Sequence, residues 1–337
     1  MAKKILGVDI GHDNLKLALV KGREVLETVA VPMPQNMIRD GHIVSPETMS
    51  EMIRDAIREN RLRVADGACI IPNERVYVKN VEMPQMTADQ LVYNLPFEFR
   101  DYITGEIRDY VFDYAMLSEP GTIQKRAEGE EEAPTMELLA VGALRADIEE
   151  TRSIMRSAGL RLKKAAPEIC AYIQLIRIDS ESREDPEEEY CILDLGYRSI
   201  RMYMFRGERH VVTRELDTGL SVLDEDLADI FNVDIHLAHT YLSSNYENCQ
   251  YREECLAVYE SIAMELMRVM NFYRYSNPDS NIRDMWLCGG GSMIEPLRNA
   301  ISDALDMNVF PARDLVPGGN EIPDCSSFVQ AIGIAME

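Results

Sequence analysis

The sequence of 337 residues contains no long hydrophobic run and is poor in basic residues. No stretch reaches the ~18 apolar residues that a helix needs to span a bilayer, so we expect no direct membrane insertion. Asp9 interrupts the apolar start too early for a signal peptide. Lys and Arg number 35 against 58 Asp and Glu, a net charge of −23. Because such a surface repels phosphate backbones, we expect no nucleic-acid partner, and an anionic ligand must be held locally by backbone N–H groups or a metal.

Two short signatures of nucleotide-binding proteins are also missing. There is no Gly-x-x-x-x-Gly-Lys-Ser/Thr loop and no Gly-x-Gly-x-x-Gly turn. The seven cysteines are an odd number without Cys-x-x-Cys spacing, which indicates reduced thiols in a cytoplasmic protein. His236 and His239, with Cys249 and Cys255 downstream, fit no spacing typical of zinc ligands.

Hydrophobic periodicity predicts strands interleaved with helices, which is typical of an α/β fold. Strands are expected first at residues 4–10, 15–20 and 23–31, with a tight hairpin at Lys21-Gly22. Ser45 and Pro46 predict a helix start, as cap and first-turn proline. Further strands are predicted at residues 68–72, 76–81, 110–117, 136–143, 190–195, 199–206, 209–216 and 284–287. Further helices are predicted at residues 87–102 (kinked at Pro96), 146–158, 167–178 and about 253–275.

Two acidic segments interrupt this pattern. Residues 118–135 contain Glu128-Gly129-Glu130-Glu131-Glu132 and are predicted to be a solvated loop. Residues 179–189 carry seven Asp and Glu residues and are the best candidate for a domain boundary.

An internal repeat is the strongest signal in the sequence. The segment that begins Asp9-Ile10-Gly11 matches the segment that begins Asp194-Leu195-Gly196, at a constant offset of 185 residues and without a gap over 14 positions. Each copy reads as two strands joined by a hairpin that opens with Asp-apolar-Gly. A repeat this long indicates a duplicated domain rather than a solenoid unit.

The residues of the repeat suggest phosphate and metal chemistry. Glycine lets a ligand approach the backbone closely at Gly11 and Gly196, and successive N–H groups in such a turn can cradle phosphates. Asp9 and Asp194, at strand ends, would face each other across a cleft and hold Mg²⁺ through water. A third element, the glycine turn at residues 289–291, suits an adenine or ribose. Each motif alone is usually only a turn, but the three together predict a nucleotide cleft.

On these motifs the sequence resembles the actin-like ATPase superfamily, and within it the type IV pilus assembly protein PilM family, which is related to FtsA. The resemblance extends over nearly the whole chain. It includes Gly7-Val8-Asp9-Ile10-Gly11, Val81-Glu82-Met83-Pro84, Leu139-Ala140-Val141, Arg214-Glu215-Leu216 and Gln330-Ala331-Ile332-Gly333-Ile334-Ala335. It implies a duplicated α/β, actin-like (ribonuclease H-like) fold with two lobes around a nucleotide cleft. The implied units are a first subdomain at 1–75 completed by a helix at about 320–337, an inserted small α+β subdomain at 76–165, and a second lobe at 166–319.

The resemblance also implies a site for ATP and Mg²⁺. Asp9 and Asp194 would organise the metal and a catalytic water. The residues expected to contact the nucleotide are Gly11, His12, Asp13, Asn14, Lys16, Gly196, Tyr197, Arg198, Ser199, Gly219, Gly289, Gly290, Gly291 and Ser292.

Several residues depart from the family pattern. The first hairpin has His12 and Asp13 where these proteins usually carry Thr or Ser, and Tyr197 and Arg198 in the second hairpin are bulky. No strong general base is evident, so we expect at most a slow ATPase.

The function that the resemblance implies is a cytoplasmic scaffold of pilus machinery, or of a related secretion or DNA-uptake apparatus. Its inserted subdomain would dock the cytoplasmic tail of a PilN-like inner-membrane protein, which would recruit it to the inner face of the membrane. Self-association stays open, as do two alternatives, an FtsA-like filament protein and a small-molecule kinase of the same superfamily. The sequence shows no acid in a recognisable substrate motif, and from its ending at Ala335-Met336-Glu337 we expect no direct membrane binding of the FtsA kind. The segment with Val92, Leu95, Phe97 and Phe99 reads equally well as core and as a partner groove.

Overall fold

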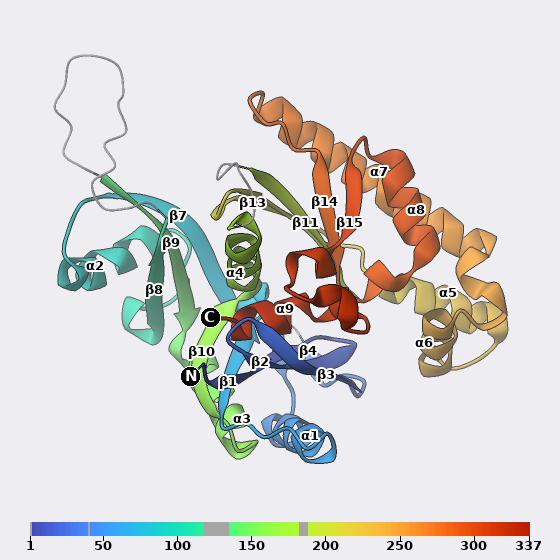
Figure 1. Cartoon of the computed structure of the whole chain (residues 1–337), viewed down its shortest axis with the longest axis horizontal. Helices are drawn as coiled ribbons and strands as arrows, with labels where there is room; N and C mark the ends of the chain where they lie inside the picture. Colours follow the sequence, from blue (N-terminus) through green and yellow to red (C-terminus); the bar gives the residue numbers. More distant parts are fainter. Residues whose placement is uncertain (1, 40, 118–134, 182–187) are drawn as a thin grey trace.

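The computed structural model describes residues 2–39, 41–117, 135–181 and 188–337. It has two lobes, each built on a five-stranded sheet, and a smaller subdomain with a three-stranded sheet that projects from the first lobe (Figure 1). The first acidic segment lies outside the described residues except for Thr135, and so does most of the second one. In the described part of the chain, no helix is both long enough and apolar enough to cross a membrane. All seven cysteines are free thiols.

The first lobe contains the sheet with strand order β10-β6-β1-β2-β3. Its strands are β1 (Lys4–Ile10), β2 (Asn14–Lys21), β3 (Glu24–Pro32), β6 (Asp66–Ile71) and β10 (Arg161–Pro167). Apolar side chains that alternate along β1 and β2, such as Leu6, Val8, Leu15 and Leu17, are fully buried against helix α1 (Pro46–Glu59). The predicted start of α1 is confirmed, because the Ser45 side chain accepts a hydrogen bond from the Thr48 N–H. A short ribbon, β4 (Ile38–Arg39) and β5 (His42–Ile43), precedes this helix.

The second lobe repeats this topology in the order β13-β12-β11-β14-β15. Its strands are β11 (Glu189–Leu195), β12 (Ile200–Arg206), β13 (Arg209–Leu216), β14 (Asp284–Cys288) and β15 (Asn308–Pro311). Asp9 lies opposite Lys16 in the first hairpin, and Asp194 lies opposite Arg201 in the second. Since these pairs are also separated by 185 residues, the predicted duplication is confirmed at the level of strand register.

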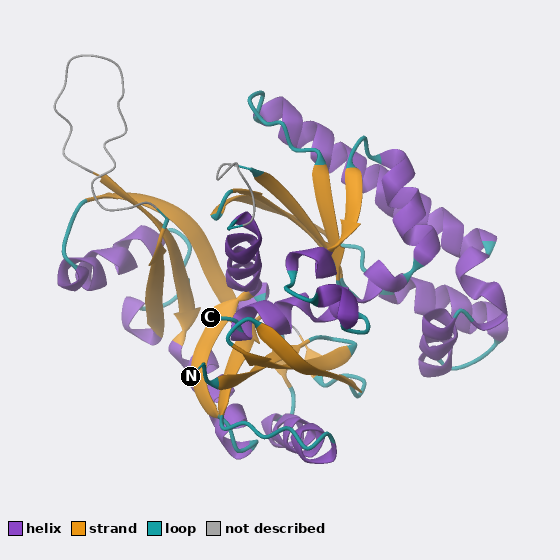
Figure 2. Cartoon of the chain, in the orientation of Figure 1, coloured by secondary structure: helices purple, strands orange, loops and turns teal. Residues whose placement is uncertain are grey.

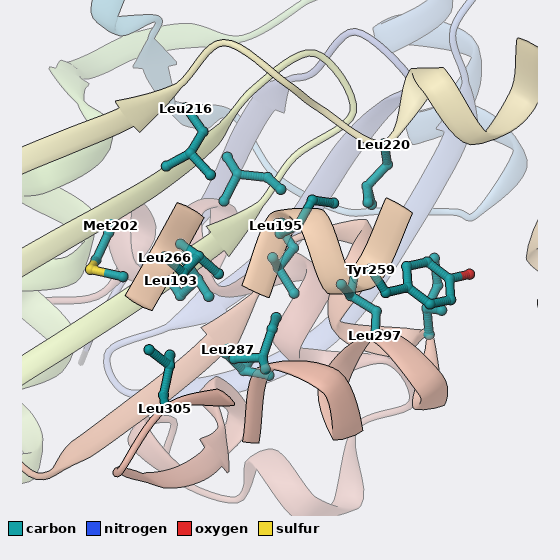
Figure 3. Packing of buried hydrophobic residues seen from close by; sticks show 14 of the residues in the cluster. Leu193, Leu195, Met202, Leu216, Leu220, Tyr259, Leu266, Leu287, Leu297 and Leu305 are labelled. Carbon is teal, nitrogen blue, oxygen red and sulfur yellow. The ribbon is translucent and has the colours of Figure 1, made fainter. Parts of the chain in front are cut away.

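Four helices share one apolar cluster with the second sheet. They are α5 (Ser221–Phe231), α6 (Ile235–Ser244), α7 (Glu253–Ser276) and α8 (Glu295–Ala304). Figure 3 shows how Tyr259 and Leu266 of α7 and Leu297 of α8 gather over the strand residues Leu195 and Leu287. This packing fixes the ends of β11 and β14, where the candidate site lies.

Two helices lie between the sheets, α4 (Glu168–Ser180) and α9 (Cys325–Ala335) (Figure 2). Both belong to a single apolar cluster that includes Ala18 and Val20 of the first hairpin and Tyr203 and Phe205 of the second. The lobes are therefore joined through a shared core, which we call the floor of the interlobe cleft.

The inserted subdomain has the strand order β7-β9-β8 and one covering helix. Its elements are β7 (Val76–Pro84), α2 (Ala88–Asn94), the 3₁₀ turns η2 (Leu95–Phe99) and η3 (Ile107–Asp109), β8 (Tyr110–Met116) and β9 (Thr135–Leu144). The predicted helix at 87–102 is shorter than expected. Its α-helical part ends at Asn94 and a 3₁₀ turn follows, because Pro96 has no N–H to continue the hydrogen-bond ladder. Leu91, Leu95 and Phe99 are buried on the sheet, whereas Val92 and Phe97 are exposed.

Helix α3 (Arg145–Ser157) and strand β10 pack with the first lobe. Helix α3 contacts α1, and β10 pairs in parallel with β6. The expected range of 76–165 for the inserted subdomain therefore takes in two elements that the first sheet holds, and the packing favours an end near Leu144. Hydrophobic periodicity does not predict β10, because it is an edge strand with basic residues and a terminal proline. The remaining 3₁₀ turns are η1 (Asn73–Arg75), η4 (Tyr246–Tyr251), η5 (Gly290–Met293), η6 (Ala312–Leu315) and η7 (Gly319–Glu321).

Candidate functional site

A cavity of about 500 Å³ lies between the two lobes. Both hairpins and the glycine turn after β14 contribute to its wall. The expected site residues that line it are Asp9, Gly11, His12, Asp13, Asn14, Lys16, Asp194, Gly196, Tyr197, Arg198, Ser199, Gly289 and Gly290. Segments nearly 300 residues apart in the sequence thus meet at one place.

Three expected site residues lie behind this wall. Gly219 packs against the backbone of Arg198, and Gly291 packs against Leu195. The Ser292 hydroxyl donates a hydrogen bond of 2.7 Å to the Gly289 carbonyl. These residues shape the wall and do not face the cavity.

The glycine turn is built for close approach to the second hairpin. Gly289 has a φ of +79°, and a Cβ atom there would lie 2.4 Å from Asp194 Oδ1. A side chain at this position would therefore strain the backbone and collide with the buried carboxylate. Gly290, by contrast, has no atom within 4 Å of its ideal Cβ position. The turn is tight on the protein side and open where it lines the cavity.

Asp9 and Asp194 are buried carboxyls that interact electrostatically. Burial raises the pKa of Asp9 to about 6, and the nearby Asp194 adds to this while Lys16 opposes it. Burial also raises the pKa of Asp194, and Lys16, Arg201 and a 2.9 Å hydrogen bond from Gln330 Nε2 act in the opposite direction. A cation at this site would relieve both effects.

The two aspartates suit a hard divalent cation. Mg²⁺ binds through one or two carboxylates together with phosphate oxygens and water. Among the described residues, no group of three or more His, Cys, Asp or Glu side chains converges as a complete metal site. Asp9 and Asp194 are therefore a fitting partial ligand set for Mg²⁺ carried by a phosphate ligand.

Glu168 is a cavity residue that the sequence analysis missed. It is the first residue of α4, and burial raises its pKa to about 7. Arg201 Nη1 lies 3.2 Å from one of its oxygens, and Asn73 and the Tyr203 hydroxyl donate to the other. Its only local signal is a Pro-Glu pair at a predicted helix start.

Arg201 occupies the position in the second hairpin that Lys16 occupies in the first. It forms salt bridges with Glu74, Glu168 and Glu215. Lys16 lines the cavity and has no salt-bridge partner among the residues that the structure describes. The cation of the first hairpin is therefore available to a ligand, and that of the second is engaged.

His239 is the second residue whose place in the site the sequence did not reveal. It lies on α6 and reaches the first hairpin, where Nε2 is 3.0 Å from Asp13 Oδ1. Nδ1 is 2.9 Å from Asp224 Oδ2 of α5. These two carboxylates raise the pKa of His239 to about 10. Burial lowers the pKa of His12, so that ring is neutral near pH 7.

The paired sheets, the duplicated hairpins and the cleft between them define the actin-like ATPase fold. The sequence pattern of the type IV pilus assembly protein PilM family matches residues 7–337. The chain therefore belongs to this family.

Solved structures agree with this fold. The PilM–PilN type IV pilus biogenesis complex is similar with a TM-score of 0.81 and 22% identity, over 98% of this chain and 97% of that chain. The ethanolamine utilization protein EutJ from Carboxydothermus hydrogenoformans is similar with a TM-score of 0.59 and 15% identity, over 98% of this chain and 88% of that chain. MreB 5 of Spiroplasma citri, solved with bound AMPPNP, is similar with a TM-score of 0.52 and 10% identity, over 99% of this chain and 95% of that chain. At these identities the likeness concerns the fold alone. No curated protein matches the sequence.

Proposed function

We propose that this protein is a cytoplasmic, nucleotide-binding scaffold of a type IV pilus machine. It holds ATP with Mg²⁺ in the interlobe cavity and docks the tail of a PilN-like inner-membrane protein. The observation that carries the nucleotide part is the convergence of both Asp-x-Gly hairpins and the Gly289–Gly290 turn on one cavity of about 500 Å³. A cavity of this size lies in the usual range of small-molecule sites.

The residues of the cavity have distinct roles in this proposal. Backbone N–H groups of the two hairpins hold the phosphates, and Lys16 supplies positive charge beside them. Asp9 and Asp194 bind Mg²⁺, which offsets the charge of the phosphates in this acidic protein. The open side of Gly290 accommodates the nucleoside.

Turnover of ATP is slow in this proposal. Glu168 lines the cavity, and its raised pKa suits a proton acceptor near neutral pH. However, both of its oxygens are already engaged, by Arg201 on one side and by Asn73 and Tyr203 on the other. A carboxylate held in this way is a poor base for water.

Calorimetric titration of MgATP tests the nucleotide site. The informative variants are Lys16→Met and Lys21→Met, which remove the same charge from the same strand. Only Lys16 lines the cavity. We expect Lys16→Met to raise the Kd about tenfold or more, a change of ~1.4 kcal/mol or more, and Lys21→Met to change it less than about twofold. Equal effects of the two variants, or no heat at millimolar MgATP, would refute the assignment.

The inserted subdomain supports the docking part of the proposal. Its helix α2 exposes Val92 and Tyr93, and the following turn exposes Phe97. Large apolar side chains gathered at one exposed site are typical of partner surfaces. The net charge of −23 also complements the Lys- and Arg-rich segments that flank membrane spans on the cytoplasmic side. A short basic and apolar tail is therefore the occupant that we propose.

Titration of a synthetic peptide of the PilN-like protein's cytoplasmic tail tests the docking surface. Tyr93→Ser and Tyr275→Ser are matched variants, because both tyrosines are highly exposed, at 77% and 87%, and only Tyr93 belongs to the inserted subdomain. We expect Tyr93→Ser to weaken peptide binding about tenfold and Tyr275→Ser to leave it unchanged. Affinity should also fall as salt is added. Loss of binding in both variants alike would place the tail elsewhere.

A further inference from the structure

The contact between His239 and Asp13 joins the two lobes at the edge of the cavity. Asp13 belongs to the turn between β1 and β2, and His239 belongs to α6 of the second lobe. Their side chains are partly exposed, at 29% and 31% of their surface, whereas Asp224, on the other side of the imidazole ring, has no exposed side-chain surface. We call this partly exposed edge the mouth of the cavity.

The geometry suits a doubly protonated imidazole. Each ring nitrogen lies within 3.0 Å of an oxygen that belongs to a carboxylate. An ionised carboxylate only accepts hydrogen bonds, and a neutral imidazole has only one N–H to donate. His239 is therefore an imidazolium that donates to both lobes, and such charge-assisted hydrogen bonds are the strong ones.

The partners of His239 are themselves held in place. Asn14 Nδ2 donates to the other oxygen of Asp13 at 2.6 Å, and the Met33 N–H donates to the Asp13 carbonyl at 2.8 Å. On the second lobe, the Tyr197 ring meets the imidazole edge-on with ring centroids 5.7 Å apart. The contact thus links two ordered structures and not two free side chains.

We propose that Asp13, His239 and Asp224 form an ionic latch that closes the mouth of the cavity, and that the Asp13–His239 contact must break for the lobes to separate there. The floor of the cleft is joined mainly by apolar side chains of α4 and α9, and Glu168 of α4 is bound there to Arg201 of the second hairpin. The latch is therefore an ionic contact between the lobes at the mouth, in addition to the Glu74–Arg201 ion pair in the cavity wall. When the Asp13–His239 contact breaks, the hydrogen bond to Asp224 still holds the imidazolium on the second lobe.

The latch also affects how an anionic ligand enters the cavity. A phosphate that approaches the Gly11–Asn14 turn meets the negative charge of Asp13 and the positive charge of His239, and Arg198 lies in the same wall. The phosphate competes with Asp13 for the imidazolium, so ligand entry and latch opening are coupled. The latch itself does not depend on the proposed function, since it is a contact within the ligand-free chain.

Hydrogen–deuterium exchange of the ligand-free protein tests the latch. The amides of residues 11–14 and of α6 are followed in wild type, His239→Gln, Asp13→Asn and the double variant, with His236→Gln as control. His236 is an exposed histidine on the same helix. We expect about tenfold faster exchange at residues 11–14 in both single variants, no further acceleration in the double variant, and no change in the control. Because Asp224 is buried, His239→Gln/Asp224→Asn provides a second latch-free protein without an uncompensated charge.

Two results would overturn the latch. One is faster exchange confined to α6 with residues 11–14 unchanged, which would mean that His239 only neutralises Asp224. The other is additive effects of Asp13→Asn and His239→Gln, which would mean that the two residues act separately. Neither measurement requires nucleotide, so failure of the nucleotide site would leave the exchange result intact, and a missing latch would leave the calorimetric result intact.

Discussion

The two hairpins of this protein share a backbone and differ in how they use their charged residues. Asp9 and Asp194 occupy equivalent positions and both are buried at the cavity. The equivalent cations behave differently, because Lys16 faces the cavity unpaired within the described chain and Arg201 is bound by three carboxylates. The comparison teaches that two hairpins of the same register can leave one cation facing the cavity and bind the other in a cluster of carboxylates.

The largest expected effect comes from removing the charge of Arg201 and, in a second variant, of its equivalent Lys16. Arg201→Met would leave the buried Glu168 without its ionic partner, and loss of one member of a buried ion pair costs about 3–5 kcal/mol. We expect Arg201→Met to lower the free energy of unfolding by about 3 kcal/mol, measured by urea denaturation. Lys16→Met, at the same position of the repeat, should lower it by less than about 1 kcal/mol and affect nucleotide binding instead. Similar stability losses in both would contradict the division of roles.

The sequence predicted much of this arrangement, because the signals were local. The Asp-x-Gly hairpins, the repeat at a constant offset and the glycine turn are each encoded within about 15 residues, and their register follows from period-two alternation. Helix α1 was equally predictable from Ser45 and Pro46. The nucleotide assignment itself stays a prediction.

The missed features depend on contacts between distant segments. His239 meets Asp13 across 226 positions of sequence, and nothing in the pattern of α6 indicates that contact. Glu168 becomes a cavity residue only because β10 joins the first sheet and directs α4 between the lobes. Such residues acquire their role from tertiary packing, which composition and periodicity do not report.

A second prediction concerns the glycine turn that supports the second hairpin. Gly289→Ala would place a Cβ atom 2.4 Å from Asp194 Oδ1 at a positive φ, and strain of this kind costs about 1–3 kcal/mol. We expect a loss of about 2 kcal/mol in the free energy of unfolding. The neighbouring Gly290→Ala has open space and should change stability by less than about 0.5 kcal/mol, which urea denaturation of both variants would establish. A costly Gly290→Ala would show that the turn is not open toward the cavity.

A third prediction uses pH to test the ion pairs that His239 forms with Asp13 of the first hairpin and with Asp224 of α5. Because Asp13 and Asp224 raise the pKa of His239 to about 10, its ion pairs stabilise the folded state fully below pH 6.5. That stabilisation declines as the pH rises and is lost above pH 10. Tyr197 and Arg198 also face this part of the cavity and are present in both proteins under comparison.

The measurement is the difference in urea midpoint between wild type and His239→Gln. We expect the advantage of wild type to be largest at pH 6 and smallest at pH 10. His236→Gln should show no such trend, because its side chain is exposed and forms no ion pair in the described part of the chain. A difference that stays constant with pH would mean that the charge of His239 does not contribute.

The smallest expected effect concerns Asp13 and Arg198, which occupy the same position of the repeat with opposite charge. Both line the cavity, so a phosphate ligand is repelled by the first and attracted by the second. We expect Asp13→Asn to lower the Kd for MgATP about threefold, because it removes a repulsive charge and frees His239. Arg198→Gln should raise the Kd by a similar factor, and calorimetry at 50 and 300 mM salt should show both effects shrinking as the charges are screened. If both substitutions shifted the affinity in the same direction, the side chains of the two hairpins would not face a common anion, and the asymmetry between the copies would belong to the fold alone.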